Sequence, residues 1–216
     1  MIQAVIFDMD GVLVDSEFAM RKAAILALQE WGVSAKHEDF IPFTGAGEDR
    51  FVGGVAELHG VPYVLDMKRR AYEIYLDICN EDIVCFEKIP ETIERLSDMG
   101  LKIAIASAAD DIKVKANIGA AGINPMYLGA LVTGSDVEKK KPDPSAFLLA
   151  AKKLDVEPQH CVVIEDAVNG IIAANRAGMF SIGILSSFSE KELTDAGATF
   201  LAKETYMIPE LIRRLD

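Results

Sequence analysis

The chain is 216 residues long, and its 22 basic and 34 acidic side chains leave a formal net charge of −12. Apolar residues make up 50% of the chain and charged residues 26%, which is typical of globular proteins and excludes a wholly disordered one. Its apolar runs are all shorter than the roughly 20 residues of a membrane span. The acidic balance argues against nucleic acid or an anionic membrane as a partner, and we expect neither.

The chain begins with a short apolar run, Ala4–Phe7, that is typical of a buried strand. The residues that follow, as far as Cys85, instead repeat apolar side chains at helical spacing. The helices predicted in this block are 18–31, 51–59 and 65–78. We therefore predict that residues 16–86 form an α-helical cap domain inserted after the first strand.

Beyond Cys85, short apolar strands alternate with helices. The predicted strands are 101–106, 130–133, 161–164 and 180–185, and the predicted helices are 91–99, 111–121, 144–154 and 167–177. This alternation indicates a parallel sheet with helices on both faces. We predict an α/β fold in which residues 1–15 and 87–216 form a Rossmann-like core domain that includes the first strand.

Polar side chains gather where the predicted strands end, which is where open parallel sheets bind ligands. The residues at or just beyond these ends are Asp8, Asp10, Ser107, Lys141, Glu165 and Asp166. Each of them alone could be a turn, cap or surface residue. Together at one edge of one sheet they predict a functional site.

The residue types of this set indicate phosphate chemistry. Neighbouring carboxylates repel one another and need a cation, and hard oxygen ligands with no histidine or cysteine beside them favour Mg²⁺. A lysine and a hydroxyl can then hold the oxygens of a phosphate. A carboxylate at the strand end, Asp8, can accept the phosphoryl group, and Asp10 can act as general acid and base.

Four segments resemble the motifs of the haloacid dehalogenase-like (HAD) superfamily. They are 8–17 (DMDGVLVDSE), 105–110 (IASAAD), 140–144 (KKPDP) and 162–170 (VVIEDAVNG). The resemblance covers nearly the whole chain, including the cap, and is greatest to the β-phosphoglucomutase and phosphoglycolate-phosphatase branch. Segments 39–56 and 107–122 also resemble the HAD domain fused into a plant thylakoid protein.

The resemblance implies a role for each motif residue. Asp8 would be the nucleophile that becomes an aspartyl phosphate. Asp10 would protonate the leaving oxygen and then activate water. Ser107 and Lys141 would bind the phosphoryl group.

The resemblance also implies the ligands of an Mg²⁺ cofactor. Asp8 and Asp166 would bind the ion through their carboxylates, and Asp10 would contribute its backbone carbonyl. Glu165 would be a further ligand or a neighbour that supports one.

The cap is expected to select the substrate. Segment 42–51 resembles the cap loop that faces the active site in relatives, and its polar candidates are Glu48 and Arg50. Arg69 and Arg70 could contact a second anionic group of a substrate, or simply lie on a solvated helix face.

Two departures from the family bear on the reaction. Met20 stands where β-phosphoglucomutases carry a histidine, and Glu48 stands where they place an arginine for a second phosphate. Both argue against a mutase, which must hold a bisphosphate twice. We expect a Mg²⁺-dependent phosphatase acting on a small phosphorylated metabolite such as a sugar phosphate. A hexose-phosphate mutase and a catalytically silent binding protein are the alternatives.

The sequence also bears on location and assembly. Its three cysteines are few, odd in number and without metal-ligand spacing, which fits a reducing compartment. The N-terminus has neither a basic patch nor a cleavable apolar core. We expect a cytoplasmic protein that is a monomer or a weak homodimer.

Overall fold

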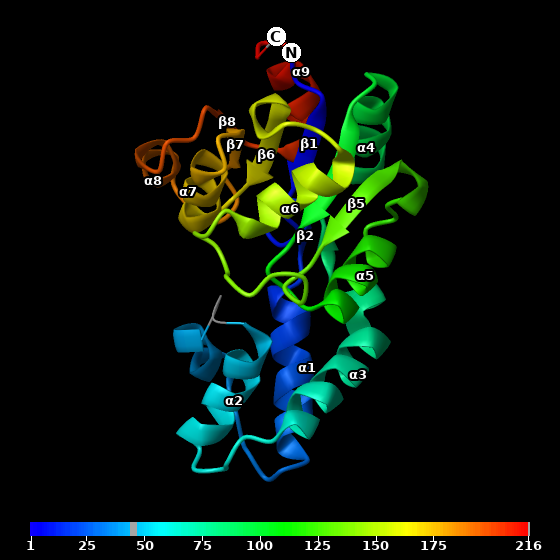
Figure 1. Ribbon diagram of the computed structural model, residues 1–216. Coiled ribbons are helices and arrows are strands. Elements are labelled where there is room, and N and C mark those ends of the chain that lie inside the picture. Colours follow the sequence, from blue (N-terminus) through cyan, green and yellow to red (C-terminus); the bar gives the residue numbers. More distant parts are fainter. Residues whose placement is uncertain (44–46, 216) are drawn as a thin grey trace.

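Among residues 1–43 and 47–215, which the computed structural model describes, six parallel strands form the central sheet (Figure 1). In spatial order they are β5 (Leu128–Val132), β4 (Lys102–Ala106), β1 (Ala4–Phe7), β6 (Cys161–Glu165), β7 (Phe180–Ile184) and β8 (Phe200–Ala202). In the register of the sheet, Phe7 lies opposite Ile105 on one side and Ile164 on the other. The predicted α/β class and Rossmann-like sheet are confirmed.

Helices cover both faces of the sheet because strand side chains alternate between two cores. In β1, Val5 and Phe7 enter one core, and Ala4 and Ile6 enter the other. The helices of the first core are α4 (Ile89–Asp98), α5 (Asp111–Ala120) and α9 (Ile208–Ile212). Those of the second are α6 (Ser145–Leu154) and α7 (Val168–Arg176). Burial of the strands on both faces explains their continuous apolar sequence.

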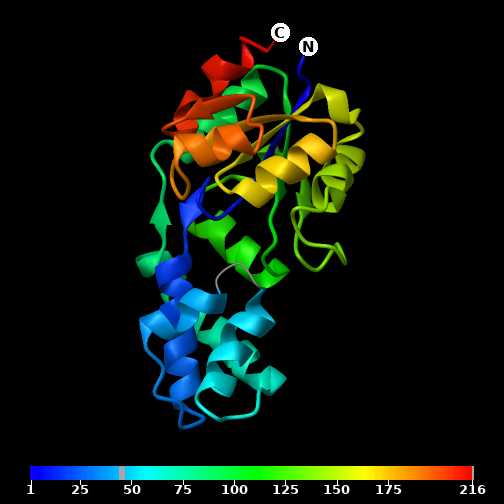
Figure 2. The same ribbon diagram turned by 90° about the vertical axis from the view of Figure 1, so that its left-hand side faces the viewer.

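A helical region with a core of its own lies beyond one end of the sheet (Figure 2). Its helices are α1 (Glu17–Gln29), α2 (Glu48–Leu58) and α3 (Leu65–Asp82), together with the 3-10 helix η1 (His37–Phe43). Leu28, Phe40 and Tyr75 are fully buried within it. This is the α-helical cap that the sequence predicts.

Two connections join the cap to the sheet. The first is a short antiparallel ribbon of β2 (Val14–Asp15) and β3 (Val84–Cys85), which carries the chain into and out of the cap. The second is the packing of α3 against α5, where Asp110 accepts hydrogen bonds from Lys68 Nζ at 3.2 Å and Tyr72 Oη at 3.1 Å. The domain boundaries drawn from the sequence fall beside the ribbon and stay a prediction.

The structure also contains elements that the sequence did not predict. They are β2, β3 and β8, the helices α8 (Glu190–Asp195) and α9, and the 3-10 helices η1, η2 (Pro125–Tyr127), η3 (Pro158–His160) and η4 (Thr205–Met207). All are too short for apolar periodicity to reveal them. No helix of residues 1–43 and 47–215 is long and apolar enough to cross a membrane.

The apolar core around α4 gives a direct test of this packing. Leu96 on α4 is fully buried, whereas Leu76 on α3 is 42% exposed. We expect Leu96→Ala to lower the free energy of unfolding by about 2–5 kcal/mol because it leaves a cavity. The matched variant Leu76→Ala is expected to change it by less than about 0.5 kcal/mol. Urea denaturation measures both, and equal losses would contradict the assigned packing.

Candidate active site at the carboxyl ends of the strands

The order of the strands brings the predicted site residues together. Asp8 follows β1, Ser107 follows β4, Glu165 ends β6, and the loop after β5 carries Lys141. Because β5, β4, β1 and β6 are successive neighbours in the sheet, these ends lie side by side. The backbone N–H of Asp8 donates to Ile164 at 2.9 Å, which aligns Asp8 with the end of β6.

Three of these residues form a buried acidic cluster. Carboxylate oxygens of Asp8, Glu165 and Asp166 all lie within 4.8 Å of one another, and the three side chains are buried. Lys141 Nζ donates to Asp8 Oδ1 at 2.5 Å and to Glu165 Oε1 at 2.9 Å. One ammonium balances one of three negative charges, so the cluster fits a divalent cation bound through hard oxygen ligands.

Two glycines leave room for carboxylates of the acidic cluster. Gly11 has φ +81°, and a Cβ there would lie 1.9 Å from Asp166 Oδ2. A Cβ on Gly170 in α7 would lie 1.6 Å from Glu165 Oε1. The other oxygen of Glu165 accepts from the backbone N–H of Asp166 at 2.8 Å. Only residues without side chains leave room for these two carboxylates.

Burial has a large effect on protonation in the cluster. It raises the pKa of Asp8 to about 7, although the charge of Lys141 opposes the rise. Burial and the charges of Glu165 and Asp8 raise the pKa of Asp166 to about 8. The charges of Asp8 and Glu165 raise the pKa of Lys141, although burial opposes this rise. Without a cation the cluster therefore holds protons that a bound metal would displace.

Asp10 lies outside the acidic cluster. Its Oδ1 accepts a hydrogen bond from Ser16 Oγ, and its Oδ2 accepts one from Lys113 Nζ at 2.9 Å. The carboxylate is not part of the group whose oxygens lie within 4.8 Å of one another, although it lines the same pocket. Its role as a metal ligand through the backbone carbonyl stays a prediction.

A pocket of about 480 Å³ extends from these residues to the cap. Ser107, Lys141 and the acidic residues line the end next to the sheet. Apolar side chains and Glu48 line the end next to the cap, and the apolar ones there include Met20, Phe43 and Phe51. The pocket can therefore hold a phosphate at one end and an organic group at the other.

Of the predicted cap residues, Glu48 alone lines this pocket, and burial raises the pKa of its carboxyl group. Arg50 instead binds Glu57 at 2.7 Å and lies over the Phe43 ring. Arg70 binds Glu30 and Glu73. Residues 44–46 of the predicted cap loop lie outside the described residues.

The site also contains several residues that the sequence did not indicate. Lys113, Ser16 and Ser187 contact Asp10 or Asp166, and Lys140 donates to the carbonyls of Ala108 and Gly134 at 3.0 Å. Lys113 and Ser187 stand outside the four motifs. Ser16 lies inside the first motif but looks like an ordinary loop residue. Lys140, inside a run of three lysines, could have been found by its place next to Lys141.

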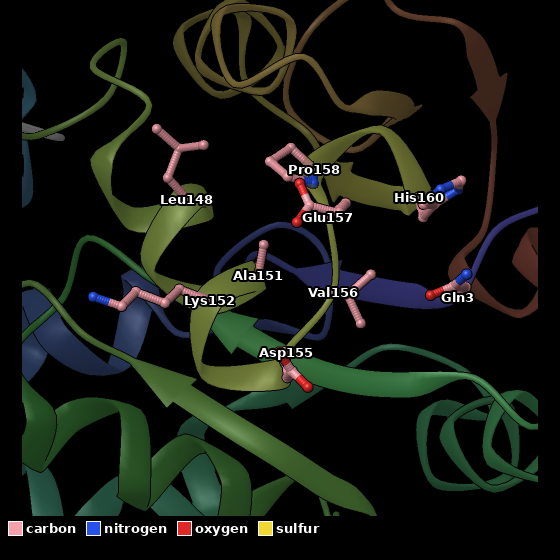
Figure 3. Close-up of a pocket in the computed structure, with 9 residues that line it drawn as sticks. All are labelled: Gln3, Leu148, Ala151, Lys152, Asp155, Val156, Glu157, Pro158 and His160. Carbon is pink, nitrogen blue, oxygen red and sulfur yellow. The ribbon is translucent and has the colours of Figure 1, made fainter.

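A second hollow of about 570 Å³ lies at the opposite edge of the sheet (Figure 3). It is lined by residues of α6 and η3, by Val156 in the loop between them, and by Gln3 just before β1. Figure 3 shows Lys152 and His160 pointing in opposite directions. Its polar side chains do not converge, so we assign it no chemistry.

Comparisons with known proteins agree with this geometry. The family model "haloacid dehalogenase-like hydrolase" matches residues 2–178. The chain is 44% identical over 204 residues to the chloroplastic protein SUPPRESSOR OF QUENCHING 1 of Arabidopsis thaliana, covering 93% of this chain but 19% of that protein. It is 30% identical over 216 residues to a phosphorylated carbohydrates phosphatase of Thermotoga maritima, covering 94% of each chain.

Solved structures share the whole architecture. The crystal structure of CbbY from Rhodobacter sphaeroides in complex with phosphate superposes with a TM-score of 0.82 at 27% sequence identity. The match covers 96% of both chains.

The close approach of Gly11 to Asp166 gives the first prediction for the site. Gly11→Ala is expected to displace Asp166 and to remove most of the rise in Tm caused by Mg²⁺. Gly32→Ala is a matched control, because Gly32 has φ +75° but nothing within 4 Å of a Cβ. Both variants carry the backbone cost of about 1–2 kcal/mol for a left-handed residue. An equal Mg²⁺ response in the two variants would contradict the assigned role of Gly11.

The raised pKa values of Asp8 and Asp166 give a second prediction for the site. In the folded, metal-free protein Asp8 and Asp166 keep protons up to about pH 7 and 8, above the value of 3.8 in an unfolded chain. Their contribution to stability therefore falls as the pH rises, and a bound cation relieves this loss. We expect the Mg²⁺-induced rise in Tm to be larger above pH 8 than below pH 7. Scanning calorimetry with and without Mg²⁺ measures it, and a response independent of pH would count against the cluster as the binding site.

Proposed function

Because the chain belongs to the haloacid dehalogenase-like hydrolases, within the capped β-phosphoglucomutase and phosphoglycolate-phosphatase-like subfamily, we propose that it is a Mg²⁺-dependent phosphatase of sugar phosphates. The observation that carries the proposal is the contact of Asp8 with Lys141 inside the buried acidic cluster. This contact lies at one end of a pocket large enough for a sugar, which supports Asp8 as the nucleophile and Lys141 as the cation that binds the phosphate.

Asp8 is the nucleophile of the proposed reaction. A carboxylate oxygen of Asp8 forms a bond to phosphorus while the bond from phosphorus to the sugar oxygen breaks. Asp10 must hold a proton at this point; it gives that proton to the leaving oxygen and becomes the carboxylate to which Ser16 and Lys113 donate. It then takes a proton from water, whose oxygen forms a bond to phosphorus while the bond from phosphorus to the Asp8 oxygen breaks. This step frees inorganic phosphate and restores the Asp8 carboxylate.

The phosphoryl oxygens are held by residues next to Asp8. The Lys141 side chain is 10% exposed, and its short contact to Asp8 supports a position beside any group bound to that carboxylate. The Ser107 side chain is 3% exposed and lines the same end of the pocket. A buried ammonium and hydroxyl stabilise charge on the transferring group more strongly than water does.

Asp8, Glu165 and Asp166 would hold Mg²⁺. When bound, the ion neutralises the negative charge that Asp8 and the phosphate bring together. Lys141 neutralises a further charge. This arrangement lets an acidic chain bind an anionic substrate.

The cap end of the pocket supports a substrate with one phosphate. Among the residues that the structure describes, Arg21 is the one basic side chain of the cap that lines the pocket, and it is paired with Glu17. The Glu48 carboxyl can accept hydrogen bonds from sugar hydroxyls. These features favour a phosphatase over a mutase, whose intermediate carries two phosphates.

We also propose a cytoplasmic location. Cys79, Cys85 and Cys161 are free thiols, and Cys79 and Cys161 are buried. Reduced thiols without a partner support a reducing compartment.

Replacement of the nucleophile tests the mechanism. Asp8→Asn removes the attacking oxygen charge and is expected to reduce phosphate release by at least about 10³-fold. Asp111→Asn is the control, because Asp111 lies on the exposed side of α5 in an ion pair with Lys115. Phosphate release with Mg²⁺ is measured on glucose 6-phosphate, fructose 1-phosphate and 6-phosphogluconate. Turnover by Asp8→Asn at the rate of Asp111→Asn would contradict the mechanism.

Product analysis separates the phosphatase from the mutase. The unmodified protein is given β-glucose 1-phosphate with a bisphosphate primer. We expect inorganic phosphate as the main product, because the pocket offers no unpaired cation among its described residues for the second phosphate. Glucose 6-phosphate formed faster than phosphate would show that the mutase assignment is correct.

A further inference from the structure

We propose that Lys113 is a positioning residue that fixes the carboxyl group of Asp10 on the leaving-group side of the pocket. The inference rests on the proposed phosphatase function, in which Asp10 gives a proton to the leaving oxygen. Lys113 stands on α5, outside the four sequence motifs, and none of the roles implied by the family resemblance falls on it.

Lys113 is unusually placed for a lysine. Its side chain is 10% exposed, and its ammonium lies 2.9 Å from Asp10 Oδ2. Lysines are rarely buried unless they are paired, so the contact with Asp10 explains why the Lys113 side chain can be buried despite the cost of removing its charge from water. By contrast, Lys115 on the same helix is 66% exposed and pairs with Asp111.

The two oxygens of Asp10 have separate donors on different parts of the chain. Ser16, at the start of the cap, donates to Oδ1, and Lys113 donates to Oδ2. Donors on both oxygens fix the plane of the carboxyl group as well as its position. Lys113 lies in the first turn of α5, where its backbone N–H donates to Asp110, just beyond the phosphate-binding segment at Ser107. The same short segment therefore places the phosphate and the proton donor relative to each other.

Lys113 also faces the cap. Its ammonium interacts electrostatically with Glu48, and Tyr75 of α3 lies near the same group. Lys113, Glu48 and Asp10 all line the pocket. The ammonium thus links the acidic residue of the cap to the acid and base of the core, at the place where the leaving sugar must lie.

A lysine that only stabilises the fold would affect all substrates equally. A residue that positions the proton donor affects the substrates that need the proton. Sugar oxygens leave poorly without protonation, whereas the phenolate of p-nitrophenyl phosphate leaves without it. The value of kcat/KM reports the steps up to loss of the leaving group, so it isolates this difference.

The experiment compares Lys113→Met with the matched control Lys115→Met, both with Mg²⁺. Substrates are p-nitrophenyl phosphate and whichever of glucose 6-phosphate, fructose 1-phosphate and 6-phosphogluconate the unmodified protein hydrolyses fastest. We expect Lys113→Met to lower kcat/KM for the sugar phosphate by about 10²-fold and for p-nitrophenyl phosphate by less than about 5-fold. Lys115→Met should leave both values unchanged. The ratio of the two values within one preparation does not depend on the fraction of folded protein.

Lys113→Arg provides a second variant that keeps the positive charge. We expect its ratio of kcat/KM for the sugar phosphate to kcat/KM for p-nitrophenyl phosphate to lie between those of Lys113→Met and the unmodified protein. An equal fall for both substrates in Lys113→Met, or no fall, would overturn the role of Lys113 and leave the proposed function intact. Absence of hydrolysis of every substrate by the unmodified protein would instead overturn the proposed function, and the inference with it.

Discussion

Asp8, Glu165 and Asp166 bring three carboxyl groups into one buried cluster, and when all three are ionised the ammonium of Lys141 balances a single one of their charges. Such a cluster is unstable unless a further positive charge or protons occupy it. The surrounding fold maintains it through strand order and through glycines that leave room for two of the carboxylates. A site that lowers the stability of the metal-free protein is thereby ready to bind a metal and a phosphate.

The cap completes the site from the other side of the pocket. It contributes Glu48 and several apolar side chains, while α3 is fastened to α5 through Asp110. The helix α5 begins just after the phosphate-binding segment and carries Lys113, which holds Asp10. In the proposed mechanism, phosphate binding, proton transfer and cap contact therefore meet on one short stretch of chain.

The sheet, its helical cover and the cap could be predicted from sequence, because long apolar patterns determine them. The acidic cluster could be predicted as well, since parallel strands bring their carboxyl ends to one edge. Ribbon strands β2 and β3 could not, because two-residue strands carry no periodicity. Nor could the contact between Lys113 and Asp10, which joins residues 103 positions apart. Arg50 and Arg70 carry suitable charges, but they pair with acidic neighbours and do not line the pocket.

The central claim is that Asp8 carries the phosphoryl group during turnover. Rapid acid quenching of the reaction with Mg²⁺ and a sugar phosphate, followed by peptide mapping by mass spectrometry, tests it most directly. The account predicts one added phosphoryl group on the peptide that contains Asp8, formed and lost at rates consistent with phosphate release. Phosphate release at the same rate with an unmodified Asp8 peptide at every quench time would contradict it.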